Sequence, residues 1–254
     1  MKRKLVKARF KGLSEQIDTL TDTEYFQTHG ETLYDVGRNT VKRFRWEGVD
    51  MVVKRFGGIS VFNRLMYGTF RESKAMRAYK YASKLRAMHI ATPEEIAVVE
   101  TFNYGRMVDS YFISMYASCR PLSFLQEFTF EKTEWFPLLD ALAIWLREVH
   151  DKGILHQDLN LGNILYQEHP DGKFSFQLID NNRMKFGRHW SLDARLKDLC
   201  RLTANLDLFH YVLKQYLSYY RCDYRPAQRK GYFYKLMFEY RQEVKKKLKR
   251  WGKG

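Results

Sequence analysis

Residues 156–165 of the chain read HQDLNLGNIL, and after a short turn residues 176–183 read FQLIDNNR. The first segment has the spacing H-x-D-x-x-x-x-N, which places Asn163 five residues after Asp158. The second segment is an apolar run that ends in a carboxylate, Asp180. The turn between the two runs predicts a β-hairpin, which would bring Asn163 close to Asp180.

These residue types suit the transfer of a phosphoryl group. The reaction spreads negative charge over phosphoryl oxygens, so a protein contributes mainly oxygen ligands for Mg²⁺ and a proton acceptor. Asp180 and Asn163 are the predicted metal ligands, Asp158 accepts or orients the hydroxyl of the acceptor, and His156 braces the loop. The segments therefore predict the catalytic loop and metal site of a kinase. The alternatives are a plain polar turn between a helix and a hairpin, and an inactive copy of the motif.

Strand patterns fill the first half of the chain. Residues 33–36, 41–46 and 49–56 are rich in strand-forming side chains and are separated by short turns, which suits an antiparallel meander. Apolar residues at helical spacing predict a helix over about 71–88, and a second helical stripe covers 134–150.

Together these patterns predict an α+β fold, the two-lobe fold of protein kinases. The N-lobe would hold an N-terminal extension, the antiparallel sheet, one main helix and the nucleotide site, over residues 1–118. The C-lobe would be short and mostly helical, over residues 119–254, and would carry the catalytic loop and the metal site.

Lys54 lies on the third predicted strand, where kinases place a lysine that pairs with the α- and β-phosphates of ATP. Glu72 is the only acidic residue of the following helix, so it is the natural partner for Lys54. Both residues have a plainer interpretation. Lys54 could be an exposed strand lysine, and Glu72 could be a carboxylate that favours the start of a helix.

The predicted nucleotide loop is unusual because it holds a single glycine, Gly37. Many kinases cradle phosphates with several glycines, so Arg38, Asn39 or Thr40 would replace part of that backbone contact here. The adenine base would lie beside Met115 and Tyr116, whose backbone groups can bond its edge. An ordinary buried strand is equally compatible with those two residues.

Residues 52–56, 73–75, 91–93, 156–165 and 178–183 together resemble the bacterial lipopolysaccharide core kinase family. The resemblance covers roughly residues 30–200. It implies a protein-kinase-like fold and the use of ATP and magnesium. It also implies an acceptor hydroxyl on an inner-core sugar, either 3-deoxy-D-manno-octulosonic acid (Kdo) or heptose.

Departures from eukaryotic protein kinases agree with a small acceptor. Gln157 replaces the arginine of H-R-D that receives a phosphorylated activation loop, and Asn160 replaces the usual lysine. Asn181 and Asn182 follow Asp180 where those enzymes have Phe-Gly. The alternatives left open are a protein kinase, a kinase of another small molecule, and a catalytically silent kinase-like module that binds membrane or protein.

The chain is strongly basic, with a formal net charge of +15. Residues 221–254 contain twelve Lys/Arg and three Asp/Glu, interleaved with aromatic and aliphatic residues. A helix of this kind can lie on an anionic membrane, or it can pack its aromatic side chains on the lobe and solvate its lysines. No nucleic-acid partner is expected, because no recognisable nucleic-acid module accompanies the charge.

The expected location is cytoplasmic and peripheral on the inner face of the cytoplasmic membrane, where a lipid A-linked core saccharide would be the acceptor. Three scattered cysteines do not form a disulfide framework, and the N-terminus lacks the apolar run of a secretory signal. The most apolar stretch, 135–146, is short and interrupted by Asp140, so no transmembrane helix is predicted. The sequence does not determine an oligomeric state.

Overall fold

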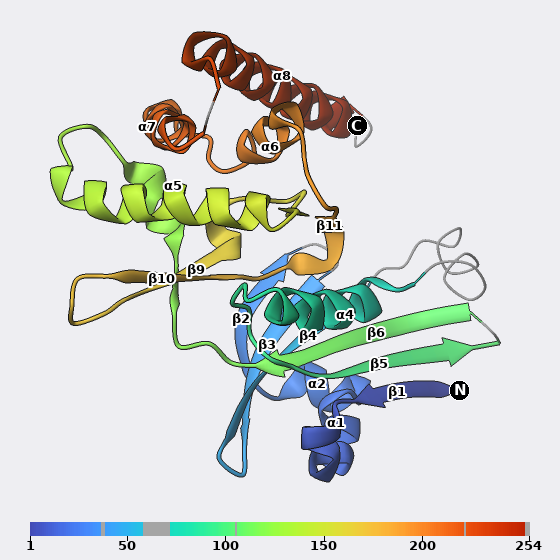
Figure 1. The fold of residues 1–254 in the computed structure, drawn as a ribbon. Coiled ribbons are helices and arrows are strands. Elements are labelled where there is room, and N and C mark those ends of the chain that lie inside the picture. Colours follow the sequence, from blue (N-terminus) through green and yellow to red (C-terminus); the bar gives the residue numbers. More distant parts are fainter. Residues whose placement is uncertain (37–38, 58–71, 105, 221, 252–254) are drawn as a thin grey trace. The chain divides into compact units, whose positions relative to one another are not determined.

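The computed structural model describes residues 1–36, 39–57, 72–104, 106–220 and 222–251. It divides into two compact units, drawn in Figure 1. The first unit consists of Met1–Ser118 and Asp180–Asn182. The second unit consists of Cys119–Ile179 and Arg183–Gly254.

The first unit is built on one antiparallel sheet with the strand order β1-β5-β6-β4-β3-β2. The predicted meander is confirmed as β2, β3 and β4. The elements of this unit are β1 (Lys2–Val6), η1 (Ala8–Leu13), α1 (Ser14–Leu20), α2 (Thr23–Thr28), β2 (Glu31–Val36), β3 (Asn39–Trp46), β4 (Val49–Phe56), α4 (Lys74–Ala87), β5 (Glu95–Asn103) and β6 (Arg106–Met115).

Helices cover both faces of this sheet. Successive strand side chains point to opposite faces, so Val53 faces one core and its neighbour Lys54 faces the other side with Phe56. On the Val53 side, Ile17 of α1 and Phe26 of α2 belong to the buried cluster. Helix α4 covers the other face (Figure 1), as the buried cluster of Phe56, Ala75 and Val98 shows.

The sequence analysis predicted an N-terminal extension but none of the strands or helices within it. β1 pairs with β5 as an edge strand, and α1 and α2 bury apolar side chains under the sheet. Helices this short have little stability of their own, so their local sequence pattern is weak. Their apolar contacts with the sheet explain why they form.

Helix α4 confirms the helix predicted after the meander. It begins after Ser73, whose side chain accepts a hydrogen bond from the backbone N–H of Met76 and so caps the helix. Arg71, where the predicted helix starts, lies outside the described residues.

The second unit is mostly helical, with two small antiparallel sheets in the orders β10-β9-β7 and β11-β8. The predicted hairpin is confirmed as β9 and β10. The elements are β7 (Arg120–Pro121), η2 (Leu122–Glu127), η3 (Thr133–Trp135), α5 (Phe136–Asp151), β8 (Ile154–Leu155), η4 (Leu161–Asn163), β9 (Ile164–Glu168), β10 (Phe174–Leu178), β11 (Lys185–Phe186), α6 (Leu192–Leu199), α7 (Leu206–Ser218) and α8 (Tyr224–Trp251), with η5 (Asn181–Arg183) at the boundary of the units.

Helix α5 confirms the second predicted helix and is the central helix of this unit. Its buried stripe includes Leu139, Leu142 and Leu146, and it packs on α7. The helix ends at Asp151, and Gly153 then takes a φ of 76° that favours glycine. This turn leads directly into β8 and the loop that follows it.

A buried lysine fastens the long helix α8 to its unit. The Lys235 side chain is 1% exposed. Its Nζ donates to the backbone carbonyls of Cys200 and Thr203 and pairs with Glu239 one turn further along the helix. A buried ammonium group is stable only when such acceptors surround it. Lys235 therefore ties α8 to the segment that follows α6.

Replacing Lys235 with Met should destabilise the second unit, because two buried carbonyls lose their donor. We expect a loss of about 2 kcal/mol in the free energy of unfolding and a fall of roughly 4–8 °C in Tm by calorimetry. Lys230→Met is the matched control on the same helix, since Lys230 is 56% exposed and pairs with Asp193 at the surface. An equal fall in Tm for both variants would contradict the role given to Lys235.

Candidate active site

The loop of residues 156–163 follows β8 and is held by a buried carboxylate. Asp198 of α6 accepts hydrogen bonds from the backbone N–H groups of His156, at 2.7 Å, and Gln157, at 2.8 Å. Its Oδ2 also lies 3.5 Å from Nε2 of His150 on α5. Gln157 has a φ of 64°, a conformation that non-glycine residues rarely adopt. The Asp198 bonds stabilise that backbone where the loop begins.

The environment of Asp198 favours its charged form. Burial alone would raise the pKa of this carboxyl, but the hydrogen bond from His150, the neighbouring imidazoles and the backbone N–H of Gln157 together hold the pKa below its ordinary value of 3.8. Asp198 was not among the residues predicted for the site. No local pattern marks it, because it lies about forty residues after the loop it holds.

His156 braces the loop, as its predicted role requires. Its Nε2 donates to the backbone carbonyl of Ile179 at 3.0 Å, which ties the start of the loop to the end of the hairpin. Asn163 does the same from the other end, because its carbonyl accepts the N–H of Ile179 at 3.0 Å. Ile179 is the residue immediately before Asp180, so both bonds fix the backbone that leads to that carboxylate.

The amide of Asn163 is oriented by a neighbouring carbonyl. Its Nδ2 donates to the backbone oxygen of Asp158 at 2.9 Å, and Nδ2 of Asn160 donates to the same oxygen at 3.1 Å. Because a carbonyl can only accept, the Asn163 amide must present its nitrogen here and turn its Oδ1 away. Oδ1 is the atom that a magnesium ion would use.

The carboxylate of Asp158 has a cationic neighbour that was not among the predicted site residues. Nη1 of Arg183 lies 3.2 Å from Oδ2 of Asp158, and the two side chains are 57% and 36% exposed. The pair is therefore open to solvent and to an arriving molecule. Arg183 ends the segment of residues 176–183, but its pairing with Asp158 depends on how the chain turns after Asp180.

In the first unit, Lys54 pairs with Asp180. The distance from Lys54 Nζ to Asp180 Oδ1 is 2.8 Å, and Asn182 Nδ2 donates to the same carboxylate oxygen. The side chain of Lys54 is 17% exposed, so it is not an ordinary exposed strand lysine. Strand β4 positions it between Val41 on β3 and Phe112 on β6.

The expected pairing of Lys54 with Glu72 is wrong in this structure. Glu72 precedes α4 and pairs with Lys80, with both side chains about half exposed. The helix itself begins at Lys74 and has no acidic residue in its first turn. Lys54 takes the carboxylate of Asp180 instead, so the interpretation of Glu72 as a carboxylate near the start of the helix describes its position better.

The predicted nucleotide loop is described only in part. Gly37 and Arg38 lie outside the described residues. Asn39 opens β3 opposite Phe56, and the Thr40 hydroxyl donates to Asp35 at 2.9 Å. Asn39 and Thr40 therefore belong to the β2–β3 hairpin and lie at the start of β3, the strand that pairs directly with the Lys54 strand β4.

The backbone N–H groups of Met115 and Tyr116, which were predicted to contact the adenine base, already have hydrogen-bond partners in the protein. The N–H of Met115 donates to the carbonyl of Glu94, and the N–H of Tyr116 donates to the carbonyl of Asp50, each at 2.8 Å. Both donors are thus used within the sheet. A base edge beside this segment would need a donor further along the chain, such as Ala117, because backbone groups at the end of a strand serve the ladder first.

The two predicted metal ligands, Asp180 of the first unit and Asn163 of the second, have the chemical groups that a magnesium ion arriving with phosphate would use. Mg²⁺ prefers carboxylate and amide oxygens and usually keeps ligands from phosphate and water. Asp180 and Asn163 supply those two oxygen types. Within the described ranges, no three His, Cys, Asp or Glu side chains form a cluster that could hold a metal without such extra ligands.

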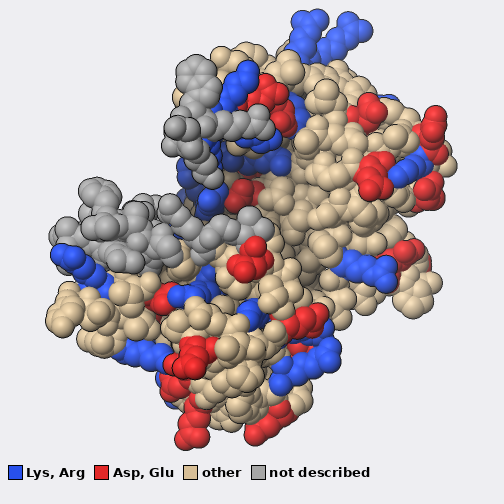
Figure 2. Space-filling model, turned by 180° about the vertical axis from the view of Figure 1, so that it is seen from behind, with Lys and Arg blue, Asp and Glu red and all other residues tan. Residues whose placement is uncertain are grey.

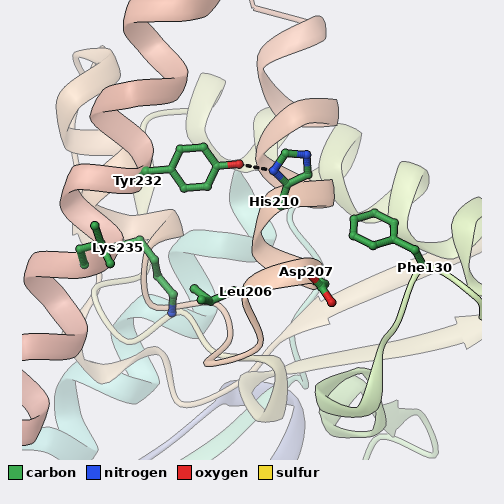
Figure 3. A pocket seen from close by; sticks show the side chains of 7 residues that line it. Phe130, Leu206, Asp207, His210, Tyr232 and Lys235 are labelled. Carbon is green, nitrogen blue, oxygen red and sulfur yellow. Dashed lines mark hydrogen bonds between the residues drawn. The ribbon is translucent and has the colours of Figure 1, made fainter.

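A pocket of about 420 Å³ in the second unit contains none of these residues (Figure 3). It lies between α7, α8 and the segment before η3. Its lining is mostly apolar, and the hydroxyl of Tyr232 bonds to Nδ1 of His210 across it. The lining residues are Phe130, Leu206, Asp207, His210, Tyr232, Lys235 and Leu236. Since no predicted site residue lines the pocket, it is a separate feature of the unit.

The fold is protein-kinase-like. A solved structure described as "WaaP in complex with acyl carrier protein" matches with a TM-score of 0.61 and 16% sequence identity. The match covers 95% of this chain and 98% of that one. The predicted fold class is confirmed.

Residues 35–220 match the Lipopolysaccharide kinase (Kdo/WaaP) family, and this chain belongs to that family. No curated protein matches the chain. The predicted family and the prediction of a kinase are both confirmed. Membership in this family implies the use of ATP and a lipopolysaccharide acceptor.

Replacing Asp198 with Asn should lower the free energy of unfolding by about 3 kcal/mol near neutral pH, because two loop N–H groups then face an amide. The folded pKa of Asp198 is depressed, so its contribution is present above about pH 4 and is lost as the pH falls through the folded value. The difference from wild type should therefore shrink below pH 4 in denaturant titrations. Asp193→Asn, at an exposed position of the same helix, should change little.

Proposed function

We propose that the chain transfers the γ-phosphoryl group of ATP to a hydroxyl of Kdo or heptose in the inner core of lipopolysaccharide. One observation carries the proposal: a partly exposed carboxylate, Asp158, lies on a loop whose backbone is fixed by the buried Asp198. Phosphoryl transfer to a sugar hydroxyl needs a proton acceptor that the protein holds in a fixed position. Membership in the lipopolysaccharide kinase family supports the class of acceptor.

ATP with magnesium supplies the phosphoryl group and spreads its charge. Lys54 is proposed to bind phosphate oxygens, which would replace Asp180 as its anionic partner. Asp180, together with the amide oxygen of Asn163, is the proposed magnesium ligand. Asn39 and Thr40 are proposed to contact the nucleotide near its phosphates, and the segment after Met115 and Tyr116 to contact the base.

Asp158 is proposed to orient the acceptor hydroxyl and take its proton. Arg183 holds that carboxylate at 3.2 Å and is itself more than half exposed. A guanidinium has several donors, so Arg183 can pair with Asp158 and with a second anion at once. Kdo carries a carboxylate that fits this position, which favours Kdo over a neutral heptose.

The proposed acceptor is a lipid A-linked core saccharide, which would place the reaction at the cytoplasmic face of the inner membrane. Such a substrate keeps its sugars at the bilayer surface. Mass analysis of lipid A-core from cells with and without the chain tests this directly. A phosphate missing from Kdo or heptose supports the proposal, whereas identical material contradicts it.

Asp158→Asn should reduce kcat for phosphate transfer by about 10²- to 10⁴-fold while nucleotide affinity stays near wild type, because the residue acts on the acceptor proton. Asp180→Ala should instead remove the magnesium dependence of nucleotide binding. Transfer is measured as ADP release that needs the acceptor, and nucleotide binding by calorimetry. The control is Asp171→Asn, an exposed carboxylate in the β9–β10 turn that pairs with Lys173. Unchanged transfer by Asp158→Asn would remove that residue from the proposed mechanism.

Arg183→Met should raise KM for a Kdo-bearing acceptor by tenfold or more, because a bidentate contact with a carboxylate is lost. A neutral heptose acceptor should show no such rise. The comparison uses the same variant with both acceptors, so a general effect on Asp158 would change both reactions alike. An equal loss with both sugars would show that Arg183 only positions Asp158.

A further inference from the structure

Helix α8 has two different long faces. One face packs on the unit through Gly231, whose hydrogen faces Leu213 of α7, and through the buried Lys235. The rings of Tyr234 and Phe238 lie beneath Lys197 and Arg201 of the neighbouring segment. The predicted packing of aromatic side chains on the lobe therefore accounts for part of the helix only.

The other face leaves large apolar side chains in solvent. We name it the α8 apolar stripe, and its members are Phe233, Leu236, Tyr240, Val244 and Leu248. Four of the five are 59–63% exposed, and Val244 is 36% exposed. The last four recur every four residues, so they follow one side of the helix. An exposed row of this length is rare on a monomer and marks a binding surface.

The stripe continues onto neighbouring elements. Leu236 also lines the 420 Å³ pocket, together with Phe130 and Leu206. Those two side chains are 47% and 58% exposed. Because all three surround the same opening, shown in Figure 3, the apolar surface extends from α8 to the start of α7 and to the segment before η3.

The charge of α8 limits what can cover the stripe. The helix carries ten Lys/Arg and only two Asp/Glu. Figure 2 shows basic side chains projecting from the end of the second unit at which α8 lies. A second copy of such a helix would be repelled, and a nucleic acid would not need an exposed apolar row. An anionic bilayer accepts both properties, because apolar groups enter the acyl boundary while lysines reach the lipid phosphates.

We propose that the α8 apolar stripe docks this protein on an anionic phospholipid bilayer, with α8 lying in the plane of the interface. This docking rests on the proposed function, in which the acceptor is linked to lipid. Because such an acceptor remains at the membrane surface, an enzyme docked there would stay close to it. Docking of this kind needs no spanning segment. In the part of the chain that the structure describes, no helix is long and apolar enough to cross a bilayer.

The experiment is co-sedimentation of the full chain with vesicles of phosphatidylcholine alone or with one third phosphatidylglycerol. We expect wild type to bind the anionic vesicles and the double variant Tyr240→Glu, Leu248→Glu to bind at least tenfold more weakly. The matched control is Tyr104→Glu, Leu5→Glu, which introduces the same charges at exposed Tyr and Leu side chains of the first unit. The control should bind like wild type.

A charge-neutral variant, Tyr240→Ser, Leu248→Ser, separates the apolar contribution from repulsion. It should lose binding as well, with an unchanged Tm, because both side chains are exposed. Equal weakening by the stripe and control variants would show that net charge alone drives binding and would overturn the proposal. So would the absence of vesicle binding by wild type. Two other results would overturn the proposal. If sedimentation velocity shows a wild-type dimer that the stripe variant dissociates, the stripe binds a second copy of the chain. If the stripe binds an acidic protein and no vesicles, that protein is its partner.

The test is independent of the proposed reaction. Phosphate transfer to a soluble, deacylated core saccharide should be unchanged in the stripe variant, because none of its residues belongs to the proposed active site. If docking fails while this transfer persists, only the docking proposal is lost. If transfer fails in wild type while vesicle binding persists, the proposed acceptor is wrong and the docking surface stands.

Discussion

One buried carboxylate, Asp198, supports the loop on which the proposed chemistry depends. It joins α6 to the first residues of the loop through two backbone N–H bonds and to α5 through His150. A carboxylate that is 1% exposed is stable only because each of its oxygens has such a donor. The two backbone hydrogen bonds to Asp198 also hold Gln157 in a left-handed conformation that this residue type rarely adopts. The rigidity of the loop is therefore a property of three elements together.

The proposed proton acceptor, Asp158, and the proposed magnesium ligand, Asp180, each pair with a basic side chain. Asp180 pairs with Lys54 in the first unit, and Asp158 pairs with Arg183 in the second. Each pair is partly open to solvent, so each cation can also attract an anion. Phosphate and an acid sugar are the anions that the lipopolysaccharide kinase reaction would bring to such groups. Each cation offsets the negative charge of its carboxylate, so an anionic group can approach either pair.

Helix α8 shows how one element can stabilise a fold and present a surface. Lys235 satisfies two buried carbonyls on the inner face, so the helix is held where most of its lysines stay in solvent. The outer face then keeps its apolar stripe at a fixed orientation. The two interpretations of the basic tail, packing and membrane contact, are therefore compatible because they concern opposite faces.

The local elements and the kind of chemistry can be predicted from the amino-acid sequence alone. Alternation predicted β2 to β4, helical spacing predicted α4 and α5, and the motif spacing selected Asp158, Asn163 and Asp180, because these patterns involve residues near each other in the chain. The partners that lie far apart in the chain became known from the folded structure. It paired Lys54 with Asp180 and Glu72 with Lys80, assigned Asp198 to the loop, and placed β1 beside β5. Such contacts depend on packing between distant segments, which leaves no periodic signal in a single sequence.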